Sequence, residues 1–291
     1  RKPMITLTPL PQKLNTKKVV STAELSFSIN LIPSSNIPLH PSSAPPPCGH
    51  LSNPVGHLSP RPYNAPSRRI SPMPDMSNPS PLSRRLYCDN AATSFPKPPE
   101  VLRAITAYAT DIGASAGRGG YAEAQRSAAV IATCRDRLNS LFNGQNPLHF
   151  LFTLNCTDAL NTAIHGTLAP HLRANTPAHA ITTQMDHNSV LRPFHAYAES
   201  ANFHATYLPV DPVTCVVDPQ DVKKALRLDT KLIAVVHGSN VTGTLQPIRE
   251  IGKIAREANI PFLVDAAQTA GHVPIDVQAD NIDLLAFPGH K

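Results

Sequence analysis

Residues 231–268, KLIAVVHGSNVTGTLQPIREIGKIAREANIPFLVDAAQ, decide the fold. The stretch opens with an apolar run (KLIAVV, 231–236), continues with a segment whose apolar residues recur at helical spacing (PIREIGKIAREA, 247–258), and closes with a second apolar run (PFLV, 261–264). Strands that are apolar throughout, separated by amphipathic helices, are typical of a mainly parallel sheet covered on both faces. The stretch therefore predicts strands at both ends of one helix.

The same alternation extends on both sides of this stretch. Further short β-rich runs are expected within 149–155, 179–184, 204–210 and 284–290. Further helices are expected within 99–110, 123–142, 157–173, 188–200 and 218–227, with prolines suited to a first helical turn before the first of them. Residues 86–291 are thus predicted to form an α/β domain with a mainly parallel sheet flanked by helices.

Residues 1–85 have a different composition. They hold 17 of the 31 prolines and ten basic residues against two acidic ones, Glu24 and Asp75. Such a segment lacks the periodic apolar faces that offset chain entropy, so a Pro/Ser-rich, basic and disordered tail is predicted. It resembles a transit peptide, or it is upstream sequence that the native protein lacks. The second reading predicts a functional chain that begins near Met76.

Charge and cysteine content limit the kinds of partner and the cellular location that can be expected. Residues 86–291 carry 16 basic and 18 acidic side chains, so the formal net charge of +6 belongs to the tail. The folded part shows no basic face interleaved with aromatic residues and no apolar run of membrane-spanning length, so neither nucleic acid nor a membrane is expected as a partner. Five cysteines without metal-like spacing predict free thiols, no metal site and a reducing, cytoplasmic location.

Polar side chains follow nearly every predicted strand. Ligands in such folds bind beyond the carboxyl ends of the strands, so one ligand could meet all of these residues. The candidates are Cys156, Thr157, His187, Asn240, Asp265, Gln268, His290 and Lys291.

Each candidate has a functional and a structural interpretation. Thr157 opens a helix, where free N–H groups attract a phosphate, but a plain helix cap explains it as well. His187 is either a ligand contact or only the polar start of a helix. Asp265 follows FLV directly, and a buried carboxylate needs a cation or a strong donor. Asp265 and Lys291 could form a salt bridge, or they could hold a heteroaromatic aldehyde between them, as pyridoxal phosphate is held.

At this point the motifs resemble a known family. The stretch from about Leu86 to Lys291 resembles the class V aminotransferases of the fold-type I pyridoxal-phosphate enzymes, in particular the cysteine desulfurase branch. The matching pieces are YCDNAATSFPKP, GASAGRGGYAEA, NCTDALNTAIHG, MDHNSVLRP, HGSNVTGTLQPIREIGKIARE, FLVDAAQTAGHVPIDV and NIDLLAFPGHK.

The resemblance implies a cofactor, pyridoxal 5′-phosphate, and a role for each candidate. Lys291 would bind the cofactor covalently, and the other candidates would contact its ring, the phenolic oxygen or the phosphate. Asp265 would pair with the ring nitrogen, Gln268 with the phenolic oxygen and His187 with the ring face; Asn240 would lie near the phenolic oxygen and the substrate carboxylate; Cys156, Thr157 and His290 would hold the phosphate.

The resemblance also implies an activity and partners. L-Cysteine would be converted to L-alanine with transfer of sulfur to an enzyme thiol, Lys291 and His187 being catalytic. A homodimer and a sulfur-acceptor protein would be the partners. A selenocysteine lyase or another class V aminotransferase remains an alternative.

Two departures limit the activity. Pro288 stands where the family usually has a serine or threonine that binds the phosphate. The family's nucleophilic cysteine and small C-terminal domain follow the lysine, and none of Cys48, Cys88, Cys134, Cys156 and Cys215 takes the nucleophile's place. The large domain is therefore expected to be incomplete and this chain alone inactive, either the cofactor-binding portion of a desulfurase or a non-catalytic protein.

Overall fold

The computed structural model describes residues 18–22 and 86–291. The chain divides into two units, residues 1–26 with 87–291 and residues 27–86, and every element described below belongs to the first. Apart from residues 18–22, the predicted disordered tail and the predicted start near Met76 lie outside the described residues.

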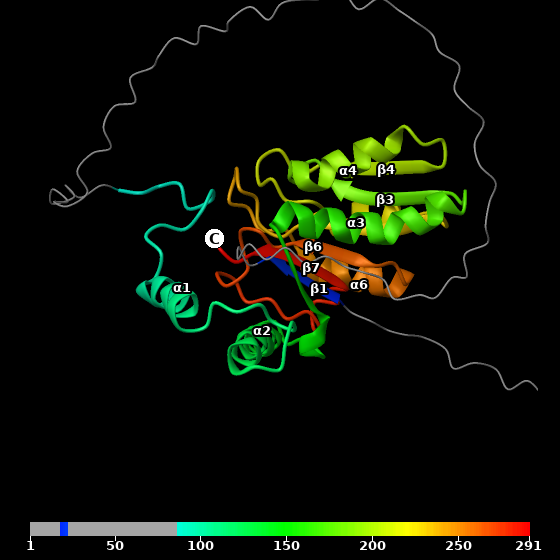
Figure 1. Ribbon diagram of the computed structural model, residues 1–291. Coiled ribbons are helices and arrows are strands. Elements are labelled where there is room, and N and C mark those ends of the chain that lie inside the picture. The colour runs from blue at the N-terminus through cyan, green and yellow to red at the C-terminus, as the bar shows by residue number, and fades with distance from the viewer. Residues whose placement is uncertain (1–17, 23–85) are drawn as a thin grey trace, which may run out of the picture. The chain divides into compact units, whose positions relative to one another are not determined.

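A seven-stranded sheet in the order β2-β1-β7-β6-β5-β3-β4 forms the centre of this unit (Figure 1). Every pair of neighbouring strands is parallel, as the apolar strands and intervening helices predicted. The strands are β1 (Lys18–Thr22), β2 (Phe150–Thr153), β3 (Ala178–Thr183), β4 (Phe203–Leu208), β5 (Thr230–Val236), β6 (Phe262–Asp265) and β7 (Leu284–Pro288).

Strand β1 lies in the segment whose composition predicted disorder, and no apolar pattern there indicated a strand. Its residue Val19 is in register with Phe150 of β2 on one side and with Leu285 of β7 on the other. Strands β2 and β7 therefore pair with β1, not with each other.

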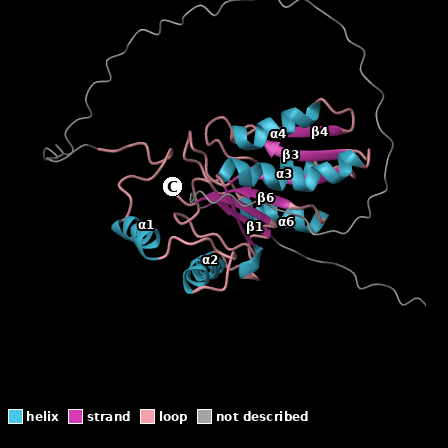
Figure 2. Ribbon diagram, in the orientation of Figure 1, coloured by secondary structure: helices cyan, strands magenta, loops and turns pink. Residues whose placement is uncertain are grey.

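The helices agree with the apolar periodicity. All six predicted helices are present within a few residues of their expected bounds, and a short 3₁₀ turn precedes β2 (Figure 2). They are α1 (Pro99–Asp111), α2 (Ala122–Leu141), η1 (Pro147–His149), α3 (Cys156–Arg173), α4 (Asn188–Ala198), α5 (Pro219–Lys224) and α6 (Ile248–Ala258).

Two apolar cores lie on opposite faces of the sheet. Successive strand residues alternate between them: Ile233 and Val235 belong to the core that includes α5 and α6, whereas Leu232 and Ala234 belong to the core that includes α3 and α4. Because side chains alternate along a strand, a strand that is apolar at every position is buried on both faces. This explains why the β5 sequence shows no polar alternation.

Helix α6 approaches the rest of the domain closely at Gly252. A Cβ atom at this position would collide with the carbonyl oxygen of Asp280. The helix ends at Asn259, whose left-handed backbone (φ 55°) is a conformation that asparagine tolerates better than most residues. Helix α6 thus packs directly against the backbone at Asp280, and the chain then leads into β6, whose last residue is Asp265.

Among the residues that the structure describes, no helix is both long enough and apolar enough to cross a membrane. The same residues contain no group of three or more His, Cys, Asp or Glu side chains that could hold a metal ion.

Candidate functional site

The carboxyl ends of the strands lie along one edge of the sheet because all strands are parallel. Cys156 begins α3 after β2, His187 precedes α4 after β3, and Asp265 is the last residue of β6. Lys291 follows β7, and the C-terminal label in Figure 1 lies beyond that strand end. The predicted site residues are thus distributed along a single edge.

Asp265 is a buried carboxylate, with 2% of its surface exposed. Its Oδ1 accepts a hydrogen bond from the Ala267 N–H at 2.9 Å, while Oδ2 accepts none from the described residues. Burial raises the pKa of the Asp265 carboxyl above its usual value, and the nearby charges of His187 and Lys291 act in the opposite direction. A carboxyl group in this state is suited to a cationic N–H partner.

The Cys156 thiol lies 3.9 Å from Asp265 Oδ1 and points its proton at it. Burial first, and then the charge of Asp265, raise the pKa of this thiol well above its usual range, whereas Lys291 lowers it. The pKa of Asp265 responds to the charges of His187 and Lys291, and the pKa of Cys156 responds to those of Asp265 and Lys291. The four residues therefore lie near one another. A thiol whose pKa is raised forms little of the reactive thiolate, so these surroundings do not favour a nucleophilic role for Cys156.

The first turn of α3 presents unpaired N–H groups. The Asn155 side chain caps the helix by accepting from the Asp158 N–H at 2.8 Å, and its carbonyl accepts from Ala159. In the described part of the chain, the N–H groups of Cys156 and Thr157 have no acceptor. Such a helix start binds anions through its free donors and its dipole.

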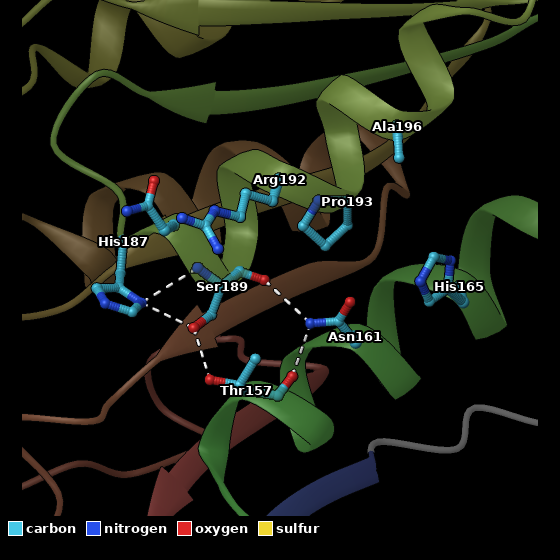
Figure 3. Close-up of a pocket in the computed structure, with 9 residues that line it drawn as sticks. Thr157, Asn161, His165, His187, Ser189, Arg192, Pro193 and Ala196 are labelled. Atoms are coloured by element: carbon cyan, nitrogen blue, oxygen red, sulfur yellow. Dashed lines mark hydrogen bonds between the residues drawn. The ribbon is translucent and has the colours of Figure 1, made fainter. Parts of the chain in front are cut away.

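A chain of hydrogen bonds links α3 to α4 (Figure 3). The Thr157 hydroxyl lies 2.8 Å from the Ser189 hydroxyl, which lies 2.7 Å from His187 Nδ1. The Ser189 N–H also donates to Nδ1 at 3.1 Å, so His187 caps α4 and its Nδ1 is an acceptor. In the neutral ring the proton is therefore on Nε2, which is the nitrogen left to meet a ligand.

The helix-cap interpretation is confirmed for His187, which caps α4, and is wrong for Thr157, because Asn155 caps α3. The ligand interpretation of both residues stays a prediction. His187 does start a helix, and in addition it lies within electrostatic reach of Asp265. The Thr157 hydroxyl, which was expected to bind phosphate, is engaged by Ser189, so only its N–H is free for an anion. Sequence analysis did not single out Ser189, because a serine in the first turn of a helix is too common to mark a site.

A cavity of about 570 Å³ opens between α3 and α4, from Thr157 and His187 near the helix starts to His165 and Ala196 farther along. Figure 3 shows Arg192 and Asn161 on opposite helices beside it, with the Asn161 side chain donating to the Thr157 carbonyl at 2.8 Å. Neither Asp265 nor Lys291 lines this cavity. It therefore borders the site on the side of the α3 N-terminus.

Three other predicted residues make different contacts. The Gln268 amide donates to the Ala91 carbonyl at 2.9 Å, and His290 Nδ1 lies 3.0 Å from the Thr93 hydroxyl. Asn240 is exposed in the turn after β5 and makes no hydrogen bond to a described residue. The structure thus brings Gln268 and His290 to the 87–97 loop, and it does not connect Asn240 to the other candidates.

Asp186 is a site neighbour that the sequence did not reveal. It is 5% exposed; its Oδ2 accepts from the Thr183 N–H at 2.9 Å and from the Thr183 hydroxyl at 2.7 Å, while Oδ1 is buried without a partner. Burial raises the pKa of Asp186 to about 7, with a smaller contribution from Asp265. Two buried carboxyl groups therefore lie near each other beneath the site.

Residues 86–291 match the sequence profile of the family described as aminotransferase class-V, so the chain belongs to that family.

Curated relatives within this family share a common description. The chain is 36% identical over 211 residues to the cysteine desulfurase IscS of Dictyoglomus turgidum, covering 72% of this chain and 52% of the relative. It is 37% identical to the IscS of Methanosarcina thermophila, with 74% and 51% covered, and 35% identical to a mitochondrial cysteine desulfurase of Candida albicans, with 72% and 42% covered. The chain spans about half the length of the curated relatives that it matches.

Solved structures show the same fold. One described as SspA in complex with cysteine superposes with a TM-score of 0.65 at 32% identity, covering 70% of this chain and 57% of that one. An apo cysteine desulfurase from Thermococcus onnurineus gives a TM-score of 0.64 at 30% identity, covering 71% and 50%. These similarities confirm the predicted fold class.

The residues present fit pyridoxal phosphate, the cofactor of this family. The free N–H groups of Cys156 and Thr157 suit a phosphate, the buried Asp265 suits a protonated ring nitrogen, and Lys291 suits an aldehyde. Pro288 is buried at the end of β7 and offers no hydroxyl, so no phosphate donor comes from that position.

Proposed function

We propose that residues 86–291 bind pyridoxal 5′-phosphate and belong to a cysteine desulfurase that acts on L-cysteine. The observation that carries the proposal is the buried Asp265 carboxyl, whose Oδ2 has no donor among the described residues and which lies within electrostatic reach of His187 and Lys291. The printed descriptions of the relatives and of the cysteine complex support cysteine as the substrate.

The bound cofactor supplies an electron sink that weakens the bonds at the substrate Cα. The chain's own groups hold and orient it. Asp265 would keep a proton on the ring nitrogen, the Cys156 and Thr157 N–H groups would bind the phosphate, and His187 would contact the ring. Lys291 Nζ would attach the cofactor covalently and would move the proton at the substrate Cα.

The sulfur-accepting thiol is a separate requirement. Burial raises the pKa of both Cys134 and Cys156, and neither is suited to attack a sulfur atom. This observation favours a second candidate function, a pyridoxal-phosphate-binding chain that does not release sulfur by itself.

Cofactor titration tests the first part. Purified chain is mixed with pyridoxal phosphate, reduced with borohydride, digested and examined by peptide mass spectrometry, with Lys291→Ala as the test variant. Lys253→Ala is the matched control, because Lys253 is exposed on α6. We expect the pyridoxyl mass on Lys291 in the wild type and the control; an absence of label there would refute the proposal.

Substrate assays separate the alternatives. Alanine release from L-cysteine supports the desulfurase, selenide release from selenocysteine supports a selenocysteine lyase, and transfer of an amino group to a keto acid supports an aminotransferase. Labelling of Lys291 without turnover of any of these would support the non-catalytic candidate.

We also propose a homodimer as the working form, with a sulfur-acceptor protein as its partner. Helix α1 has no buried residue, and Val101, Leu102 and Ile105 are between 42% and 59% exposed. Apolar side chains exposed together on one helix are suited to a protein contact. Sedimentation velocity tests the dimer: a monomer at all concentrations, with and without cofactor, would contradict it.

A further inference from the structure

Donors from the 87–97 loop converge on a single atom, the carbonyl oxygen of His290. Lys97 Nζ lies 2.6 Å from it, the Ser94 hydroxyl 3.0 Å, the Thr93 hydroxyl 3.1 Å and the Ser94 N–H 3.2 Å. A carbonyl oxygen has two lone pairs, which are shared here by four donors, one of them a charged ammonium. Together these donors restrict the position of the oxygen.

The His290 ring joins the same network. Its Nδ1 lies 3.0 Å from the Thr93 hydroxyl, and Lys97 donates to that hydroxyl at 2.8 Å. Since Thr93 has one proton and directs it to the carbonyl, the His290 ring donates from Nδ1. Both the backbone and the side chain of His290 are therefore fixed by the loop.

The loop is itself prepared for this contact. The Tyr87 hydroxyl donates to the Thr93 carbonyl at 3.0 Å, and the Phe95 N–H donates to Asn90 Oδ1 at 3.3 Å. Gln268 ties the loop to the end of β6 through the Ala91 carbonyl. The loop thus bridges the ends of β6 and β7, which carry Asp265 and Lys291.

We propose that Thr93, Ser94 and Lys97 form a clamp that positions Lys291 for the cofactor. The fixed oxygen belongs to the peptide unit between His290 and Lys291, and a peptide unit is planar, so holding the oxygen also holds the nitrogen and Cα of Lys291. The direction in which the Lys291 side chain leaves the backbone is set in this way. The inference rests on the proposed role of Lys291 and adds the residues that orient it.

The clamp also makes the amines of Lys97 and Lys291 different in reactivity. Lys97 Nζ donates to three oxygens, those of Thr93, Ser94 and His290, at 2.8, 3.1 and 2.6 Å. A lysine nitrogen that donates three hydrogen bonds has no lone pair for an aldehyde carbon. Lys291 makes no hydrogen bond to a described residue, so its amine is the one free to react.

The test replaces Lys97 in the full chain. Lys97→Met removes the donors and keeps most of the stem, and Lys97→Arg keeps charge and donors. Lys253→Met, at an exposed position of α6, is the matched control. Two measurements are made: borohydride-trapped pyridoxyl on Lys291 at subsaturating pyridoxal phosphate, and hydrogen–deuterium exchange of peptides covering 90–97 and 284–291 in cofactor-free protein. Melting temperatures identify any variant that fails to fold.

We expect Lys97→Met to lose about tenfold in Lys291 labelling, the loss typical of a charged hydrogen bond, and to exchange faster in both peptides. Lys97→Arg should recover most of the labelling, and Lys253→Met should match the wild type. Equal labelling in Lys97→Met and wild type would overturn the clamp while leaving the proposed function intact. Absence of label on wild-type Lys291 would overturn the proposed function. Hydrogen–deuterium exchange would still test the clamp in that case, because unchanged exchange in Lys97→Met would overturn it independently.

Discussion

The Cys156 thiol donates to the Asp265 carboxylate across 3.9 Å, joining the first turn of α3 to the end of β6. The contact holds the carboxyl oxygen Oδ1 together with the Ala267 N–H and leaves Oδ2 for another partner. A cysteine at the edge of an active site invites the interpretation that it reacts. Here the Cys156 thiol instead donates a hydrogen bond to the Asp265 carboxyl group.

Cysteine reactivity should follow from this contact. With iodoacetamide at pH 8, we expect the exposed Cys88 to be alkylated readily and Cys156 to remain unmodified in the folded chain, because burial and Asp265 raise the pKa of its thiol. Peptide mass spectrometry over time measures both. Denatured protein, in which both thiols react, is the control; rapid modification of Cys156 in folded protein would contradict the assignment.

Asp186 should make the protein less stable as pH rises. Its carboxyl has a pKa of about 7 when folded and its ordinary lower value when unfolded, so between about pH 4 and 7 the unfolded chain releases a proton that the folded chain retains. The contribution is at most about 4 kcal/mol, at about 1.4 kcal/mol per pKa unit. We expect Asp186→Asn to remove this decline in the free energy of unfolding, as measured by urea titration at several pH values. Parallel pH profiles for the two proteins would disprove it.

His179 should act in the opposite direction. It is fully buried between the hydroxyls of Thr230, at 2.9 Å, and Thr206, at 2.8 Å. Burial, and after it the charge of Arg227, lower the pKa of His179 to about 4. Below about pH 6.5 the unfolded chain thus binds a proton that the folded chain does not bind. The free energy of unfolding therefore decreases as pH falls toward 4. His179→Gln should lose stability at neutral pH but flatten this acid slope; the same urea titrations decide, and an unchanged slope would exclude the role.

The close approach of α6 gives a matched pair of glycine substitutions. Gly252→Ala should destabilise the fold by about 1–3 kcal/mol, because the new methyl group meets the Asp280 carbonyl oxygen. Gly166 is an exposed position of α3 where an added Cβ would meet nothing within 4 Å, so Gly166→Ala should stabilise by about 0.5–1 kcal/mol through helix propensity. Thermal unfolding of both variants measures the difference, and equal effects would refute the packing argument.

Apolar patterning predicted most of the fold. The runs that became β5 and β6 are buried on both faces, so the sequence carries their position directly. The same reasoning found Asp265, which follows an apolar run without a break. Asp186 escaped it because polar residues precede it, and the burial of two of them, Thr182 and Thr183, depends on the neighbouring strands.

The rest of the site depends on contacts between distant segments. The bond from Thr93 to His290 joins residues 197 positions apart, and neither local sequence contains a signal for the other. Strand β1 is the same kind of case, since it adds backbone pairing without an apolar pattern long enough to mark it. Tertiary hydrogen bonds of this kind become visible only in the folded chain.

The position of β1 also bears on how the protein folds during synthesis. Val19 leaves the ribosome long before one of its two partners, Leu285, which lies 266 residues further along the chain. A strand between β2 and β7 cannot complete its pairing until β7 has emerged, and contacts so far apart in sequence form slowly. The pairing of β1 with β7 is therefore expected to form late, and until then the edges of β2 and β7 that face β1 are unpaired and open to other strands.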